Sequence, residues 1–163
     1  VEKCLLFDYM AVRRLLEAGA DANYVANGFS ALSFACKHGR VDFVRLLLDK
    51  GADVNQAMYD LSPLVIACDN NNASVARLLL EKGADANETT ENFTPLLSAC
   101  AKGYVDVVRV LVENGVRVNQ ANGNLTPLHM ACERGYVDVV RVLVEKGADV
   151  NQTTDNGKSC LVI

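Results

Sequence analysis

The most reactive side chains in this sequence are cysteines, and their spacing is regular. Six are present, and five of them stand 32 residues apart, at Cys4, Cys36, Cys68, Cys100 and Cys132. Such a series could supply metal ligands or redox centres, but it contains no Cys-x-x-Cys pair. A fixed period instead indicates one structural position copied five times. We therefore expect free thiols that pack as small apolar residues, which is typical of cytoplasmic or nuclear proteins.

A second candidate for chemistry is a cysteine–histidine pair. His129 and Cys132 are three residues apart and could share a helix face, as a nucleophile and its base would. The 32-residue period argues against this role, because the cysteine recurs where the histidine position holds Ser33, Val65 or Leu97. We expect no catalytic residue, no metal site and no cofactor.

Arginine forms a third periodic series, which could act as a ladder for phosphate groups. An acidic residue follows each arginine four positions later, and such pairs are typical of a solvated helix surface. The chain has 16 Lys and Arg against 20 Asp and Glu, a net charge of −4, so we expect no nucleic-acid partner. The arginines are Arg13, Arg45, Arg77, Arg109 and Arg141.

Length and composition indicate a folded domain. The chain has 163 residues, of which 50% are hydrophobic and 22% charged, so it can bury a core. Its longest apolar run, Leu64 to Cys68, is far shorter than the ~18 residues that a membrane span needs. We expect no membrane insertion.

Helix signals recur with the same period as the cysteines. A Ser or Thr, followed by Pro in three of four cases, predicts helix starts at Ser30, Ser62, Thr94 and Thr126. Gly39, Asn71, Gly103 and Gly135 then predict left-handed stops before a second helix that ends near a further glycine. Helices of about ten residues are marginal alone, so each unit must stack on its neighbours.

The best-defined unit resembles the ankyrin repeat. It contains Thr-Pro-Leu-His-Met-Ala at 126–131, then Gly135, a Val-Val-Arg-Val-Leu helix, and Gly-Ala-Asp-Val-Asn at 147–151. The resemblance implies an all-α ankyrin-repeat solenoid of stacked helix-turn-helix units with short β-hairpin fingers. Its period is one residue below the family's usual 33, which predicts tight fingers. We expect one domain over 1–163, with full repeats at 24–55, 56–87, 88–119 and 120–151 and partial units at 1–23 and 152–163, cut from a longer protein.

Two further features leave alternatives open. The resemblance makes Asn55 and Asn151 possible sites of asparagine hydroxylation, whereas the recurrence of Asn in every turn favours a hydrogen bond to the local backbone. An apolar residue also precedes each helix start. It either packs on the residue five positions later or joins an exposed stripe that contacts a ligand. These residues are Phe29, Leu61, Phe93 and Leu125.

Positions that vary between the repeats are free to bind a partner. By the resemblance they line one concave face of fingers and first helices, where mixed charge and aromatic content suit a protein. We expect a monomeric array that acts as a protein-interaction scaffold or adaptor; the alternative is a regulatory or targeting segment of a larger enzyme or channel. The predicted contact residues are Lys37, His38, Met58, Tyr59, Asp69, Asn70, Phe93, Lys102, Asn122, Glu133 and Arg134.

Overall fold

The computed structural model describes residues 9–89, 94–121, 123, 125–153 and 159. The chain divides into two compact units, Val1–Asp85 and Ala86–Ile163. Unit 1 contains α2 (Tyr9–Glu17), β1 (Val25–Ala26), β2 (Phe29–Ser30), α3 (Ala31–Lys37), α4 (Val41–Asp49), α5 (Pro63–Asp69) and α6 (Ala73–Glu81). Unit 2 contains α7 (Pro95–Lys102), α8 (Val105–Glu113), α9 (Pro127–Glu133) and α10 (Val137–Glu145).

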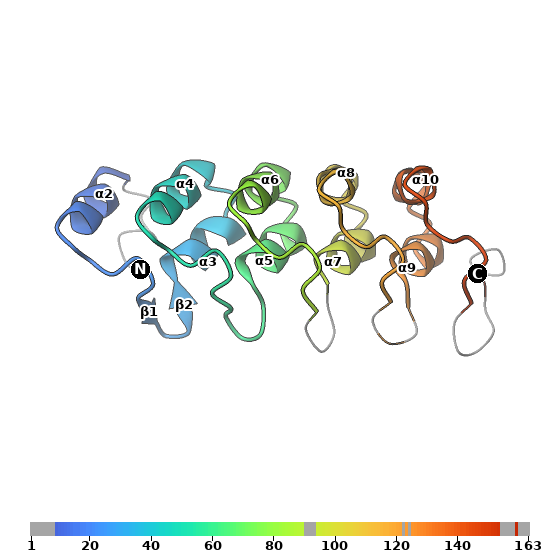
Figure 1. Cartoon of the computed structure of the whole chain (residues 1–163), viewed down its shortest axis with the longest axis horizontal. Coiled ribbons are helices and arrows are strands. Elements are labelled where there is room, and N and C mark those ends of the chain that lie inside the picture. The colour runs from blue at the N-terminus through green and yellow to red at the C-terminus, as the bar shows by residue number, and fades with distance from the viewer. Residues whose placement is uncertain (1–8, 90–93, 122, 124, 154–158, 160–163) are drawn as a thin grey trace. The chain divides into compact units, whose positions relative to one another are not determined.

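Paired helices stack side by side within each unit. In unit 1, α3 packs on α4 and on α5, and α4 packs on α6. The first helices α3 and α5 form one row, the second helices α2, α4 and α6 form another, and the β1–β2 hairpin projects from the first row (Figure 1). In unit 2, α7 packs on α9 and α8 on α10. The predicted all-α ankyrin fold with hairpin fingers is confirmed.

The predicted helix caps are present at all four positions. Ser30, Ser62, Thr94 and Thr126 have extended backbones, and each side-chain oxygen accepts a hydrogen bond from the backbone N–H three residues later. At the other end of the first helices, Asn71 and Gly103 adopt left-handed conformations, with φ of 59° and 72°. These two signals therefore fix where each short first helix begins and ends.

The cores of both units consist of small and branched apolar side chains. Leu79 and Leu111 are fully buried, and so are Cys36, Cys68 and Cys100. These cysteines are free, as is the half-buried Cys132. Burial raises the pKa of the Cys36 and Cys100 thiols, which keeps them protonated. The expectation of free, packed cysteines is confirmed for these four, whereas Cys4 and Cys160 lie outside the described residues.

The asparagine series joins consecutive repeats, so the expected bond to the local backbone is wrong. Asn23 Oδ1 accepts a hydrogen bond from Asp53 N at 2.7 Å, and Asn23 Nδ2 donates one to Gly51 O at 3.0 Å. Asn119 binds the turn at Gly147 and Asp149 in the same way. The local turn is closed instead by an aspartate two residues earlier, because Asp21 Oδ1 accepts from Asn23 N. The asparagine amide therefore reaches the neighbouring turn.

The two described fingers of unit 1 are two-residue hairpins, as the short period predicts. In the first, Val25 pairs with Ser30 across Asn27 and Gly28. In the second, Met58 and Leu61 exchange two backbone hydrogen bonds of 2.8 Å. Both residues of each turn have positive φ: 52° and 75° in the first finger, and 46° and 62° at Tyr59 and Asp60 in the second. The second finger thus forms without glycine.

Candidate protein-binding site

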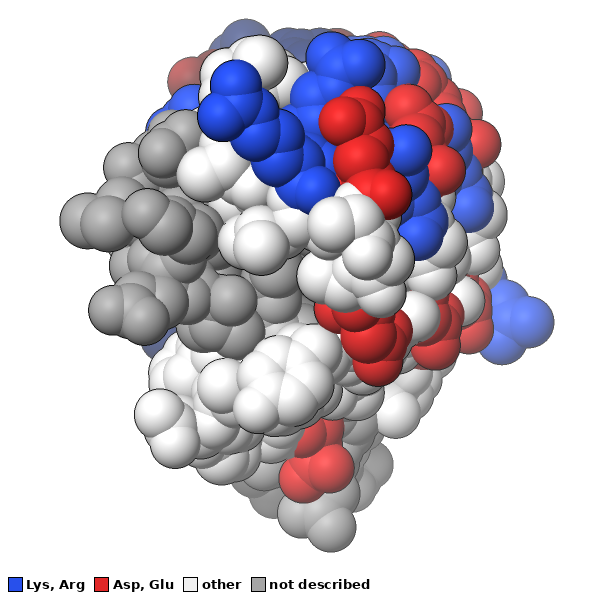
Figure 2. Space-filling view, turned by 90° about the vertical axis from the view of Figure 1, so that its left-hand side faces the viewer, with Lys and Arg blue, Asp and Glu red and all other residues white. Residues whose placement is uncertain are grey.

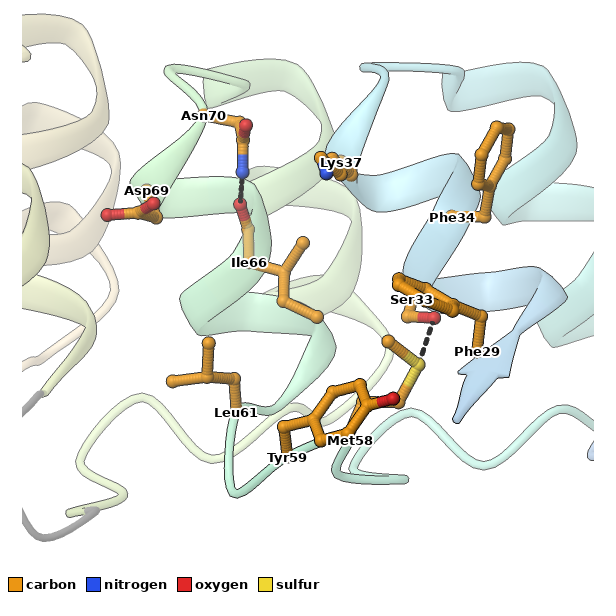
Figure 3. A pocket seen from close by; sticks show the side chains of 10 residues that line it. All are labelled: Phe29, Ser33, Phe34, Lys37, Met58, Tyr59, Leu61, Ile66, Asp69 and Asn70. Atoms are coloured by element: carbon orange, nitrogen blue, oxygen red, sulfur yellow. Dashed lines mark hydrogen bonds between the residues drawn. The ribbon is translucent and has the colours of Figure 1, made fainter. Parts of the chain in front are cut away.

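A cavity of about 400 Å³ opens between the two fingers and the first helices of unit 1. We call it the finger–helix groove. The two fingers supply its aromatic and apolar rim, α3 and α5 supply its floor, and the ends of these helices supply its polar groups (Figure 3). Its lining residues are Phe29, Ser33, Phe34, Lys37, Met58, Tyr59, Leu61, Ile66, Asp69 and Asn70.

Tyr59 is exposed and yet held in place. Its side chain is 72% exposed. Its ring meets the ring of Phe29 edge to face, with centroids 6.0 Å apart, and its hydroxyl donates to Asn27 O at 3.3 Å. Gly28 lies so close beneath the ring that an added Cβ would come within 2.1 Å of the Tyr59 hydroxyl. The first finger therefore fixes an aromatic side chain of the second at the mouth of the groove.

Met58 precedes Tyr59 in the second finger and also lines the groove. Its side chain is 8% exposed, and its sulfur lies 2.6 Å from Ser33 Oγ and 3.0 Å from Ser30 N (Figure 3). The Ser33 hydroxyl also completes the cap of α3 through Ser30. Ser33 therefore ties the first helix to the second finger, at the position that holds His129 three repeats later.

The polar end of the groove lies where α3 and α5 end. Asn70 Nδ2 donates to Ile66 O at 2.8 Å and so closes the last turn of α5. Lys37 is exposed at the last turn of α3, and Asp69 is half-buried at that of α5. The ring of His38 lies 4.4 Å from that of Phe34, next to the groove rather than in it.

The structure brings five of the predicted contact residues together in the groove: Lys37, Met58, Tyr59, Asp69 and Asn70. In unit 2, Lys102, Glu133 and Arg134 are exposed near the ends of α7 and α9, whereas Phe93 and Asn122 lie outside the described residues.

In the packing alternative, the partners of Phe29 and Leu61 five positions later are Phe34 and Ile66. They line the groove together with Phe29 and Leu61. In these two repeats, the apolar residue before the cap and the residue five positions later therefore line the same cavity. The packing alternative and the ligand-contacting alternative thus concern the same place. The sequence signal that could have located Phe34 and Ile66 in the groove was the five-residue spacing between two apolar side chains at each finger.

The comparisons with known proteins agree with the fold. A sequence profile described as ankyrin repeats (3 copies) matches residues 4–90 and 64–154. The chain belongs to the ankyrin repeat family. Among solved structures, it is similar to the ankyrin repeat domain of Bcl-3, described as a unique member of the IkappaB protein family, with 30% identity and a TM-score of 0.89. That match covers 98% of this chain and 74% of the other. A search of curated proteins returns no match.

The second helices of these ankyrin repeats carry the charged surface. On the face shown in Figure 2, Lys and Arg mix with Asp and Glu over the side that holds α2 and α4, and the finger side is mostly uncharged. Arg13 pairs with Glu17 at 2.8 Å, as the spacing predicts, but Asp49 pairs with Lys82 of the next second helix at 2.7 Å. The arginine series is exposed throughout. Acids thus accompany the cations on this surface.

The remaining candidates for chemistry have structural roles. His129 is 1% exposed, and its Nδ1 lies 2.8 Å from Thr126 Oγ1, which also caps α9. Within the described ranges, no three His, Cys, Asp or Glu side chains are grouped as metal ligands would be. No helix in the described part of the chain has the length and apolar content to cross a membrane.

Proposed function

We propose that this chain is a non-catalytic protein-interaction module that binds its partner through the finger–helix groove. Ankyrin repeats generally mediate protein–protein interaction. The observation that carries the proposal is Tyr59, an aromatic side chain that is mostly exposed and already fixed above an apolar cavity. Interface energy concentrates in such Tyr, Trp and Arg residues, and an anchor that is ordered before binding loses little entropy on association.

We also propose contact residues in unit 2, an oligomeric state and a cellular location. In unit 2, exposed Lys102, Glu133 and Arg134 near the ends of the first helices are the contact residues that we propose for that unit. The array works as a monomeric scaffold or adaptor in the cytoplasm or nucleus, where its buried thiols stay reduced. The repeats span 24–55, 56–87, 88–119 and 120–151, as the 32-residue period predicts.

The test compares two variants in a partner-capture experiment. Tyr59→Asn removes the aromatic anchor from the groove. Arg45→Glu alters the exposed surface of α4 and serves as the matched control, because one exposed charge changes stability by less than ~1 kcal/mol. Proteins captured from cells that express the chain are quantified by mass spectrometry on the unchanged chain and on both variants. A captured protein is then purified, and its affinity is measured by calorimetry.

The expected result is a partner retained by Arg45→Glu and lost from Tyr59→Asn. Removal of an interface anchor costs on the order of 1–3 kcal/mol, or about 5- to 150-fold in affinity. A partner that tolerates Tyr59→Asn and is lost with Arg45→Glu would place the working surface on the second helices.

A further inference from the structure

The finger–helix groove is apolar along most of its length and carries a cation at one end. Phe29, Met58, Leu61 and Ile66 form the apolar part, and Lys37 lies at the end of α3. A cavity of about 400 Å³ is within the range of pockets that hold small ligands. It accommodates one or two large side chains. A short segment of a partner that presents such side chains fits this volume.

The charged residues that line the groove indicate which charge the segment carries. Lys37 is exposed, and among the residues that the structure describes its ammonium group has no ion pair. The other charged lining residue, Asp69, already has an interaction of its own within the protein. The side-chain amide of Asn70 donates a hydrogen bond to Ile66 O. Of the two charged lining residues, Lys37 is therefore the more accessible to a ligand.

The backbone of the second finger also points to recognition at this site. Tyr59 and Asp60 both adopt left-handed conformations, with φ of 46° and 62°. The first finger forms the same kind of turn with Asn27 and Gly28, residue types that enter this region readily. Residues in strained conformations of this kind cluster at ligand-binding sites. Here the strained turn places Tyr59 at the groove.

We propose that the groove binds a linear segment of the partner in which a large apolar side chain stands beside an Asp or Glu. The apolar side chain enters between Phe29 and Ile66 beneath Tyr59, and the carboxylate pairs with Lys37. This inference rests on the proposed function, because it names the chemistry that the same groove selects.

The test uses a displayed library of random linear peptides. Selections are run in parallel on the unchanged chain, on Lys37→Glu, on Lys37→Gln and on Tyr59→Asn. Lys50→Glu is the matched control, because Lys50 is an exposed lysine of unit 1 at the end of α4, outside the groove. Urea unfolding of every variant establishes that each one is folded.

The unchanged chain and Lys50→Glu should enrich peptides with a large apolar residue next to an acid. A synthetic copy of one such peptide should bind Lys37→Glu about tenfold more weakly, and replacing its acid with Lys should restore the affinity. Lys37→Gln should show an intermediate loss, and Tyr59→Asn should enrich no peptide of this class.

Other outcomes separate this inference from the proposed function. Peptides that depend on Tyr59 but show no acid preference and bind Lys37→Glu normally would overturn the charge inference and leave the groove as the binding site. If no peptide is enriched, or if the enriched peptides bind independently of Tyr59, the linear-segment inference is wrong. The capture experiment with Tyr59→Asn and Arg45→Glu then decides the proposed function separately.

Discussion

Two substitutions of Tyr59 separate the strain of its backbone from the contacts of its ring. Tyr59→Ala and Tyr59→Asn both remove the edge-to-face contact with Phe29 and the hydrogen bond to Asn27 O. An aromatic pair contributes about 0.5–1.5 kcal/mol, and the lower end applies because the Tyr59 side chain is 72% exposed. Both variants therefore lose about 0.5–1 kcal/mol from the ring.

The variants differ in the cost of the left-handed turn. An ordinary L-residue in this conformation costs roughly 1–2 kcal/mol, whereas Asn enters it readily. Alanine keeps the cost that Tyr59 bears at a φ of 46°, and asparagine relieves most of it. We expect Tyr59→Ala to be destabilised and Tyr59→Asn to match or slightly exceed the unchanged chain, a difference of about 1 kcal/mol.

Urea unfolding followed by circular dichroism measures this difference. With a slope of about 2 kcal/mol per molar urea, the midpoint of Tyr59→Asn should lie about 0.5 M above that of Tyr59→Ala. The slopes of the two variants must agree, because repeat arrays do not always unfold in one step. Equal midpoints, or a higher midpoint for Tyr59→Ala, would refute the strained second finger.

Four further predictions concern the framework. Thr126→Ala should lower the free energy of unfolding by at least about 1 kcal/mol more than Thr94→Ala, because it also leaves Nδ1 of the buried His129 without its partner; equal losses in urea titrations would show that His129 adds nothing to its cap. Asn23→Ala should speed hydrogen exchange at the Asp53 amide and cost more stability than Asn55→Ala, since among the described residues the Asn23 side chain makes two hydrogen bonds to the next turn and the Asn55 side chain makes one, to Asp85 N; a larger loss for Asn55→Ala would contradict this. Titration without reductant should count six thiols in denaturant, and in the native state Cys132 should react before Cys36 and Cys100. Because burial raises the pKa of those two thiols, their contribution to stability should be constant below the ordinary thiol pKa of about 8.5 and fall above it, where only the unfolded chain loses the proton; a Cys100→Ala variant with an unchanged alkaline slope would count against this origin.

The framework was predictable because its signals are local. A Ser or Thr cap, a proline at the first helical position and a left-handed Gly or Asn each act within a few residues, so the first helices begin where the sequence predicts. The buried cysteines were predictable for a related reason, since one position copied at a fixed period must meet one environment in each repeat.

Interactions between repeats were harder to predict. The sequence suggested a local partner for the asparagine series, but stacking brings the next turn within 2.7 Å of Asn23. The groove also depends on distance in space: Tyr59 lies against Gly28, which is 31 residues earlier in the chain. No pattern within one repeat reports such a contact. The varying positions therefore predicted five lining residues, and only the packing of α3 and α5 brings them into one cavity.

Hydrogen exchange on the complex with a captured partner shows which backbone amides the partner covers. We expect slower exchange at the backbone amides of Met58 and Leu61 and across α3 when the partner is bound, with α4 unchanged. Slower exchange confined to α4 and α6, with the second finger unaffected, would contradict the finger–helix groove as the binding site.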